Sequence, residues 1–525
     1  MKAFELLVAC LQEEGVERVW GIRGAVDPGL AASFRKAGMT YMGARGHAAS
    51  GFMAAAAARV TGMPETLLAY EPHGAGLAEA VTDAVHGAVP LVVLLVAEDD
   101  GDGGRAGRAL EALGSFTVRV RAPNDIPFAV RAAFESAESG RGGPSVLVLP
   151  APLLEEVAQG EPSPARHDPA PWASPDSVRR AAELIRGAER PLLVVGRDAV
   201  RTGVGDALTR LAERIPAPVA ETYEAKGLVS EDHPLVLAAV GGSLTTIAET
   251  GADTADVVVA IGCDPDELGR PPWVGGLASV PLVHVGTRPT PMTPDYRPAI
   301  QVVGDLAASV DALASLLPPP ETRNLDAVVA IHQNRVRRFR AYGEAGDSPV
   351  PPGRILHDVR LALGPDDRVV ADSGIPRAWI ADRYPALRPH TALLPDGVGR
   401  ALYTAIALSA ATPDAQVVAL VGEDSLWAAF GELETARRLQ SRITVVLWSP
   451  IAANDAPGPG DAGLFGHADG TETERAHVVE ALGAVGWWTR WVDSARDFLP
   501  TLREALDAPP SLVAVTVAEG LPADA

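Results

Sequence analysis

Two short polar segments, each directly after an apolar run, are the parts of this sequence best suited to chemistry. The first, Gly422-Glu423-Asp424-Ser425, follows the run 416–421, and the second, Ser449-Pro450, follows the run 443–448. The spacing between them predicts a strand, a tight turn, a helix near 426–440 and a second parallel strand. Parallel sheets bind ligands at the carboxyl ends of their strands, which is where both polar segments fall. Asp424 and Ser425 could equally serve only as caps of the following helix.

The elements that must position these residues belong to three α/β segments, at 1–159, 174–317 and 353–519. A proline-rich linker at 160–172 separates the first two, and the second linker begins at Pro318 and includes a charged helix at 325–342. Continuous apolar strands that alternate with helices are typical of parallel sheets covered on both faces. We therefore expect an α/β fold of three doubly wound parallel-sheet domains. The expected strands are 18–21, 41–44, 66–70, 91–96 and 145–149, then 192–195, 219–221, 257–261 and 282–285, then 369–371, 391–394, 417–421, 443–448 and 512–516.

Composition excludes several classes of partner. The chain has 525 residues, 47% of them hydrophobic, and a formal net charge of −22, which disfavours nucleic acid and anionic membranes. The N-terminal stretch 1–15 reads as an amphipathic helix, and the longest aliphatic run, 90–97, is too short to span a bilayer. Two cysteines, Cys10 and Cys263, indicate no disulfide framework, so we expect a cytoplasmic protein.

Five motifs recur in a fixed order along the chain. They are GVERVWGIRG at 15–24, RGHAASGFMA at 45–54, ETYEAKGLVSEDHPL at 221–235, ADSGIPRAW at 371–379 and GEDS at 422–425 with its second strand. Together they resemble motifs of the thiamine diphosphate (ThDP) enzymes, and most closely those of acetolactate synthase and its carboligase and decarboxylase relatives. The resemblance implies a pyrimidine-binding, a middle and a diphosphate-binding domain, in that order.

The same resemblance implies ThDP and Mg²⁺ as cofactors. Glu423 stands where the family has a metal-ligating aspartate, and Pro450 stands where it has a ligating asparagine, so Ser449 or Asn454 would have to supply the missing oxygen. Asp424 replaces a glycine that approaches phosphate, and its charge would repel an unshielded anion. The implied cofactor-binding residues are Gly24, Gly374, Gly399, Arg400, Gly422, Asp424, Ser425 and Ser449.

His47 occupies the position of the family's catalytic glutamate, which holds the pyrimidine ring of the cofactor. A neutral imidazole can form a hydrogen bond to that ring but cannot contribute a negative charge. The start of a helix should favour its neutral form further. His47 is therefore either a repurposed acid–base or substrate-binding residue, or simply a polar residue at a helix start.

Other positions of the implied site also differ from the family pattern. Glu71 and His73 replace small residues of a turn over the cofactor, and with His47 they are the candidate catalytic residues. Arg377 and Arg400 could bind a carboxylate or phosphate, or could only pair with nearby acids. In the middle segment, the absence of a glycine cluster at 195–198 disfavours FAD.

Three hypotheses follow. The first is an active ThDP-family enzyme that forms or cleaves a carbon–carbon bond of a small 2-oxo acid or related carbonyl metabolite. The second is a protein of this fold that has lost ThDP and reuses its cleft for acid–base chemistry on a small anionic metabolite. The third is a non-catalytic subunit that pairs with a competent homologue. The resemblance further implies a homodimer or homotetramer with its site at a subunit interface.

Overall fold

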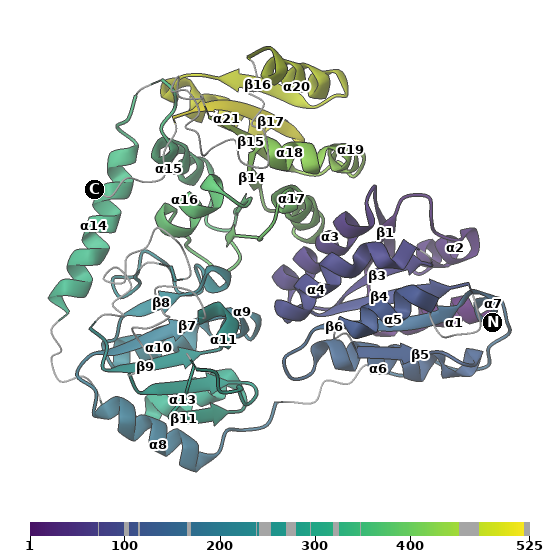
Figure 1. Cartoon of the computed structure of the whole chain (residues 1–525), viewed down its shortest axis with the longest axis horizontal. Coiled ribbons are helices and arrows are strands. Elements are labelled where there is room, and N and C mark those ends of the chain that lie inside the picture. Colours follow the sequence, from purple (N-terminus) through teal and green to yellow (C-terminus); the bar gives the residue numbers. More distant parts are fainter. Residues whose placement is uncertain are drawn as a thin grey trace. The chain divides into compact units, whose positions relative to one another are not determined.

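The computed structural model describes most of the chain. The described residues are 1–71, 73–98, 104–113, 116–164, 170–237, 239–240, 254–268, 280–294, 296–318, 325–346, 348–450 and 472–518. They form three separate parallel sheets, as the alternating pattern predicted, and Figure 1 traces these sheets from purple through teal to yellow along the chain.

The N-terminal sheet has six strands in the order β2-β1-β3-β4-β6-β5. Its central strand, Leu91–Ala97, is buried along its whole length, because helices cover both faces of the sheet. The strands are β1 (Arg18–Ile22), β2 (Thr40–Ala44), β3 (Glu65–Tyr70), β4 (Leu91–Ala97), β5 (Phe116–Arg119) and β6 (Pro144–Pro150). The helices are α1 (Ala3–Glu13), α2 (Pro28–Lys36), α3 (His47–Thr61), α4 (Ala78–His86), α5 (Gly104–Ala112), α6 (Ile126–Glu138) and α7 (Ala151–Leu154), with 3₁₀ turns η1 (His73–Leu77) and η2 (Pro123–Asp125).

The middle sheet has five strands in the order β11-β10-β9-β7-β8. Its core is aliphatic, with Leu193, Val259 and Val283 fully buried on adjacent strands. The strands are β7 (Pro191–Val195), β8 (Val219–Glu221), β9 (Val257–Ile261), β10 (Leu282–Gly286) and β11 (Ile300–Val303). The described helices are α8 (Pro175–Arg186), α9 (Arg197–Arg201), α10 (Gly205–Arg214), η3 (Tyr223–Ala225), α11 (Pro265–Leu268) and α13 (Leu306–Leu316).

The C-terminal sheet has six strands in the order β13-β12-β14-β15-β17-β16. They are β12 (Arg368–Ala371), β13 (Ala392–Leu393), β14 (Val417–Gly422), β15 (Ile443–Pro450), β16 (Trp488–Val492) and β17 (Ser511–Val517). The helices are the linker helix α14 (Asp326–Tyr342), then α15 (Pro352–Ala362), α16 (Ile375–Arg383), α17 (Arg400–Ala411), α18 (Glu423–Ala428), α19 (Phe430–Arg438), α20 (Glu472–Ala484) and α21 (Ala495–Leu506). Because β12, β14 and β15 are neighbours, their carboxyl ends lie side by side.

The chain divides into two compact units. The first contains residues 1–171 together with 406–412 and 429–439, and the second contains 172–405, 413–428 and 440–525. The residues of α19 therefore belong to the same unit as the N-terminal sheet, although they are far from it in sequence.

The predicted tight turn at 422–425 is wrong. Strand β14 continues through Gly422 and α18 begins at Glu423, so Asp424 and Ser425 lie inside the first helical turn and do not cap it from outside. Acidic residues in a first turn are favoured by the helix dipole, which explains a direct strand-to-helix passage here. The predicted single helix near 426–440 is also interrupted at Ala429, just before Gly431, a residue of low helix propensity.

None of the described helices is both long and apolar enough to cross a lipid bilayer.

Candidate functional site

His47 is the first residue of α3, and its ring lies against that of His73 in a tilted arrangement. Their ring centroids are 5.4 Å apart with an interplanar angle of 30°. Burial lowers the pKa of His47, and the neighbouring charge of His73 lowers it further. A Cβ on Gly76 would lie 3.0 Å from the Cβ of His47, so the glycine allows η1 to approach α3 closely. The structure thus brings two of the predicted catalytic residues together and favours a neutral imidazole at His47.

A buried carboxylate fixes the backbone just before His47. Glu432, on α19, is 4% exposed. Its Oε1 accepts hydrogen bonds from the backbone N–H of Gly46 at 2.8 Å and of Arg45 at 3.0 Å, and its Oε2 is 3.2 Å from the Arg45 nitrogen. These donors precede the first turn of α3, where backbone N–H groups have no intrahelical partner. Glu432 is therefore a positioning residue for His47. This role was not predicted from the sequence, because the partners of Glu432 are backbone atoms.

Glu71 and Gly24 lie in the same unit. The Glu71 carboxylate accepts a hydrogen bond from the backbone N–H of Ala106, in the first turn of α5, at 3.2 Å. It therefore has a helix-capping contact, and its proposed catalytic role stays a prediction. Gly24 follows β1 with a φ of 77°, a left-handed conformation that favours glycine.

The carboxyl ends of β12 and β14 meet at Asp372. This residue is fully buried, and its carboxylate accepts hydrogen bonds from the backbone N–H groups of Ser373 and Gly399, each at 3.0 Å. Burial raises the pKa of Asp372, while hydrogen bonds from the Ser425 side chain and from these backbone groups act against the rise. Asp372 therefore ties Ser425 of α18 to the loop that carries Gly399. The motif at 371–379 gave no sign of this role for Asp372, because its partners are backbone groups and the distant Ser425.

Glu423 and Ser449 meet at the ends of the neighbouring strands β14 and β15. The Ser449 hydroxyl donates a hydrogen bond to Glu423 Oε1, and Ser449 is fully buried. Two of the predicted oxygen ligands thus face one another. Pro450 is the last residue of β15 and offers no side-chain oxygen, and Asn454, the other predicted ligand, lies outside the described residues. Within the part of the chain that the structure describes, no group of three His, Cys, Asp or Glu side chains could hold a metal ion.

The other predicted residues of this edge are spread over its loops. Gly374 precedes α16 with a φ of 99°, and a Cβ there or on Gly422 would have open space around it. Arg377 already interacts with two neighbouring residues: its Nε donates a hydrogen bond to the Leu394 carbonyl at 3.2 Å, and its guanidinium forms an ion pair with Asp396 at 3.6 Å. The Arg400 guanidinium lies against the backbone of Gly397, and Asp424 is exposed on α18.

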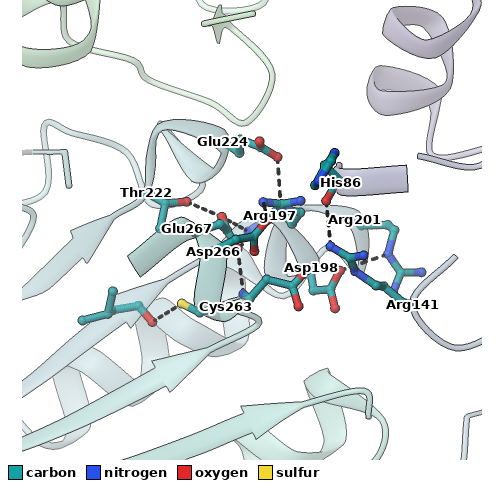
Figure 2. Close-up of polar contacts among 12 residues, drawn as sticks. His86, Arg141, Arg197, Asp198, Arg201, Thr222, Glu224, Cys263, Asp266 and Glu267 are labelled. Carbon is teal, nitrogen blue, oxygen red and sulfur yellow. Dashed lines mark hydrogen bonds and ion pairs between the residues drawn. The ribbon is translucent and has the colours of Figure 1, made fainter. Parts of the chain in front are cut away.

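The carboxyl edge of the middle sheet is filled by charged side chains of its own, as Figure 2 shows. Glu267 accepts hydrogen bonds from the Arg197 backbone N–H at 3.0 Å and from the Thr222 hydroxyl at 2.8 Å. Burial raises the pKa of Glu267 to about 8, and Arg197 acts against the rise. A Cβ on Gly196 would lie 2.5 Å from the Cα of Cys263, so the turn after β7 packs tightly against the turn after β9. The Glu267 carboxylate thus accepts the hydrogen bond of the Arg197 backbone N–H, the donor that the turn after β7 offers.

Three family descriptions match the chain in order. "Thiamine pyrophosphate enzyme, N-terminal TPP binding domain" matches residues 1–107, "Thiamine pyrophosphate enzyme, central domain" matches 178–313, and "Thiamine pyrophosphate enzyme, C-terminal TPP binding domain" matches 372–515. Thiamine pyrophosphate is the same compound as ThDP. Each match falls on one of the three sheets.

Curated relatives match along nearly the full chain. The catabolic acetolactate synthase of Raoultella terrigena is 28% identical, over 98% of this chain and 94% of its own length. A protein of Pseudomonas aeruginosa, named as a probable 2-ketoarginine decarboxylase, is 28% identical over 87% of this chain and 83% of its own. A solved structure titled "X-ray structure of a putative thiamin diphosphate-dependent enzyme isolated from Mycobacterium smegmatis" has the same fold, with a TM-score of 0.80, 19% identity and coverage of 99% of this chain and 100% of its own. Three matched domains on three parallel sheets, together with these relatives, place the chain in the thiamine pyrophosphate enzyme family, among its acetolactate synthase-like members.

Proposed function

We propose that the chain is a ThDP-using enzyme that forms or cleaves the carbon–carbon bond next to the carbonyl of a small 2-oxo acid, with His47 in place of the usual carboxylate. One observation carries the proposal. Glu423, the residue that follows β14, and Ser449, near the end of the neighbouring β15, direct oxygen atoms toward each other at the carboxyl edge of the sheet that lies in the TPP-binding match. The 2-oxo acid is proposed by analogy with the named relatives.

The residues of this edge fit the diphosphate end of ThDP. Glu423 and Ser449 supply hard oxygen atoms, which Mg²⁺ prefers, and the open space at Gly422 and Gly374 leaves their backbone accessible to a phosphate. Glu423 would hold the metal, and Ser425, tied to Asp372, would stand near the diphosphate. When bound, ThDP supplies an electron sink for a carbanion that forms next to a carbonyl.

The residues at the start of α3 do not supply the negative charge that the catalytic glutamate of the family provides. Burial lowers the pKa of His47, which favours the neutral imidazole, and a neutral imidazole offers a hydrogen bond but no negative charge. His73 lies against its ring. In the proposed enzyme, His47 forms a hydrogen bond to the pyrimidine ring of the cofactor and transfers a proton near neutral pH. Glu432 fixes the backbone that positions His47.

A second candidate function is acid–base chemistry on a small anion without ThDP. Two observations favour it: Pro450 provides no ligand, and the described residues contain no ready-made metal cluster. The histidine pair would then be the catalytic centre, and the Glu423–Ser449 contact would only stabilise the sheet edge.

For both candidates we propose a homodimer or homotetramer, by analogy with the family. Light scattering of the purified chain after size-exclusion chromatography measures this directly.

The test is a calorimetric titration of the full chain with ThDP, with Mg²⁺ and then with EDTA. The proposal expects saturable binding that needs Mg²⁺, that is lost in Glu423→Ala and that is kept in Asp414→Asn, an exposed acid near the opposite end of β14. No binding of the wild-type chain in either condition refutes ThDP use and leaves the second candidate or a non-catalytic subunit.

The role of His47 needs a separate test. With ThDP bound, consumption of a panel of 2-oxo acids should fall in His47→Ala while ThDP affinity changes little. If both His47→Ala and His47→Glu keep the wild-type rate, His47 has no chemical role.

A further inference from the structure

A cavity of about 240 Å³ lies where the linker helix α14 meets the loop after β8 and the end of α16. It is separate from the candidate cofactor edge: α16 begins beside Gly374 and ends at Arg383 in the cavity wall, about 12 Å further along the helix axis. The cavity volume is below the ~300–1,000 Å³ of sites for drug-sized ligands, so it suits a ligand of about one ring.

One wall of this cavity is aromatic and held in place. The rings of Phe339 and Tyr342 meet edge to face, with centroids 6.2 Å apart and an interplanar angle of 77°. Tyr342 also contacts Trp379 at 6.0 Å, and Phe339 contacts His357 at 5.7 Å. These contacts fix both rings before any ligand arrives, which lowers the entropic cost of binding a flat apolar group.

The rest of the lining is rich in arginine. Five arginines and three acidic residues line the cavity, although the whole chain has a net charge of −22. One of these acids, Glu231, is already neutralised by the buried Lys226 ammonium at 2.7 Å. A concave site with excess positive charge concentrates small anions.

Not all of these arginines are equivalent. Arg360 donates to the carbonyl oxygens of Leu363 and Gly364. Arg335 donates to the carbonyl of Leu237 at 2.7 Å. Both therefore hold the cavity together.

Two further lining arginines come from the helices that carry the aromatic wall. Arg338 lies one helical turn before Tyr342 on α14, and Arg383 is the last residue of α16, which also carries Trp379. Burial raises the pKa of Tyr342, and the positive charges of Arg383 and Arg338 act against this rise. Guanidinium groups bind carboxylates through charge-assisted hydrogen bonds.

His332 adds a polar group to the same lining. Its Nδ1 is buried, and among the described residues it has no hydrogen-bond partner. A buried polar atom without a partner is costly, and a ligand with an acceptor or donor would satisfy it.

We propose that this cavity binds a small metabolite that carries one carboxylate on a flat apolar body, with the carboxylate at Arg338 and Arg383 and the apolar body against Phe339 and Tyr342. The site lies at a junction within the second unit. Glu231, after β8, forms two hydrogen bonds with the backbone of Ala386, after α16: its backbone N–H donates to the Ala386 carbonyl at 3.0 Å, and its side-chain Oε2 accepts from the Ala386 N–H at 2.8 Å. A ligand here would contact the segments on both sides of this junction.

The experiment is a calorimetric titration of the full chain with benzoate, with its neutral analogue benzamide, and with inorganic phosphate. Benzoate should bind about tenfold more tightly than benzamide, the ratio that corresponds to one hydrogen bond to a charged group. Phosphate should bind more weakly than benzoate because it cannot use the aromatic wall. Equal binding of benzoate and benzamide, tighter binding of phosphate, or no binding of benzoate overturns the proposal.

Matched variants locate the site. Arg338→Met and Arg383→Met should each weaken benzoate binding about tenfold, and Phe339→Ala should weaken benzoate and benzamide alike. Arg337→Met is the control, because Arg337 is exposed on the same helix and does not line the cavity. Benzoate binding that survives both lining substitutions, or that falls equally in Arg337→Met, overturns the assignment. Circular dichroism of each variant separates lost binding from lost folding, and either folded arginine variant is sufficient for the test.

Discussion

Glu432 is the residue whose removal should most directly disturb the histidine site. Its carboxylate holds the backbone N–H groups of Arg45 and Gly46. Glu432→Ala removes both acceptors, and Glu432→Gln keeps one acceptor but places an amide N–H against a backbone donor. Both variants should make the backbone just before His47 less rigid, while His47 itself is unchanged.

The size of the effect follows from these contacts. A hydrogen bond to a charged group contributes ~1.5–3 kcal/mol, and two backbone donors depend on Glu432. Water can reach Arg45 after the substitution, because its side chain is exposed, so the two contributions will not be lost in full. We expect Glu432→Ala to destabilise this unit by about 3 kcal/mol and Glu432→Gln by about half as much.

Hydrogen exchange measured by mass spectrometry gives a local readout, and urea unfolding gives the global one. In a peptide covering residues 44–50, about 3 kcal/mol of lost protection corresponds to roughly 100-fold faster exchange. The matched control is Glu434→Ala. Glu434 lies two residues further along α19 and pairs with the Arg45 side chain at 2.8 Å, but both groups are exposed. Exposed ion pairs contribute little, so this control should exchange almost like the wild type.

The reasoning is refuted if Glu432→Ala exchanges no faster than Glu434→Ala over residues 44–50. The buried carboxylate would then not be what holds the turn before α3, and the placement of His47 would need another cause.

Three further substitutions test a buried ion pair, a close approach between two elements and a buried histidine. Glu231→Ala leaves the fully buried Lys226 ammonium without its carboxylate and should cost ~3–5 kcal/mol in urea unfolding, whereas the double change to Lys226→Met and Glu231→Leu should cost less; equal costs would argue against a buried ion pair. Gly76→Ala places a Cβ 3.0 Å from the Cβ of His47 and should lower the free energy of unfolding by ~1–3 kcal/mol, with faster amide hydrogen exchange in α3. An unchanged exchange pattern would mean that η1 shifts to accommodate the added methyl group. Burial lowers the pKa of His284 from its ordinary value of 6.5 to about 4, so between these pH values the unfolded chain binds a proton that the folded chain does not. The stability that this group contributes is complete above pH 6.5 and is lost as the pH falls toward 4. In His284→Gln, the urea midpoint should therefore depend less on pH over that window than it does in the wild type.

The three-sheet fold could be predicted because its central strands are long and apolar. β4 and β17 are buried at every position, and such runs are visible in any sequence. The strands that the sequence did not predict are β5, β11 and β16, and each lies at the edge of its sheet. Their residues are mostly half-buried, so the apolar run that marks a covered strand is absent.

Residues of the candidate site could be predicted only where their position in a motif identified them, and not where their role depends on the tertiary structure. His47 was identified from its position in a motif, and its proximity to His73 is a tertiary fact that spacing could not give. Glu432 is 385 residues away from His47 along the chain, and its partners are backbone atoms, which have no sequence signature. The start of α18 at Glu423 was missed for a different reason: Gly422-Glu423-Asp424-Ser425 has the composition of a turn, and the same residues are also favourable in a first helical turn.

The charges at the start of α18 decide how an anion could bind there. Glu423 and Asp424 place two carboxylates in the first turn, so the partial positive charge of the helix end is already offset. A diphosphate brought to this edge alone would face like charge and would be repelled. A divalent cation held by Glu423 and Ser449 reverses the sign of the field at that point. Pyrophosphate should therefore bind with Mg²⁺ and fail to bind with EDTA, and binding that is indifferent to Mg²⁺ would mean that the anion sits elsewhere on the protein.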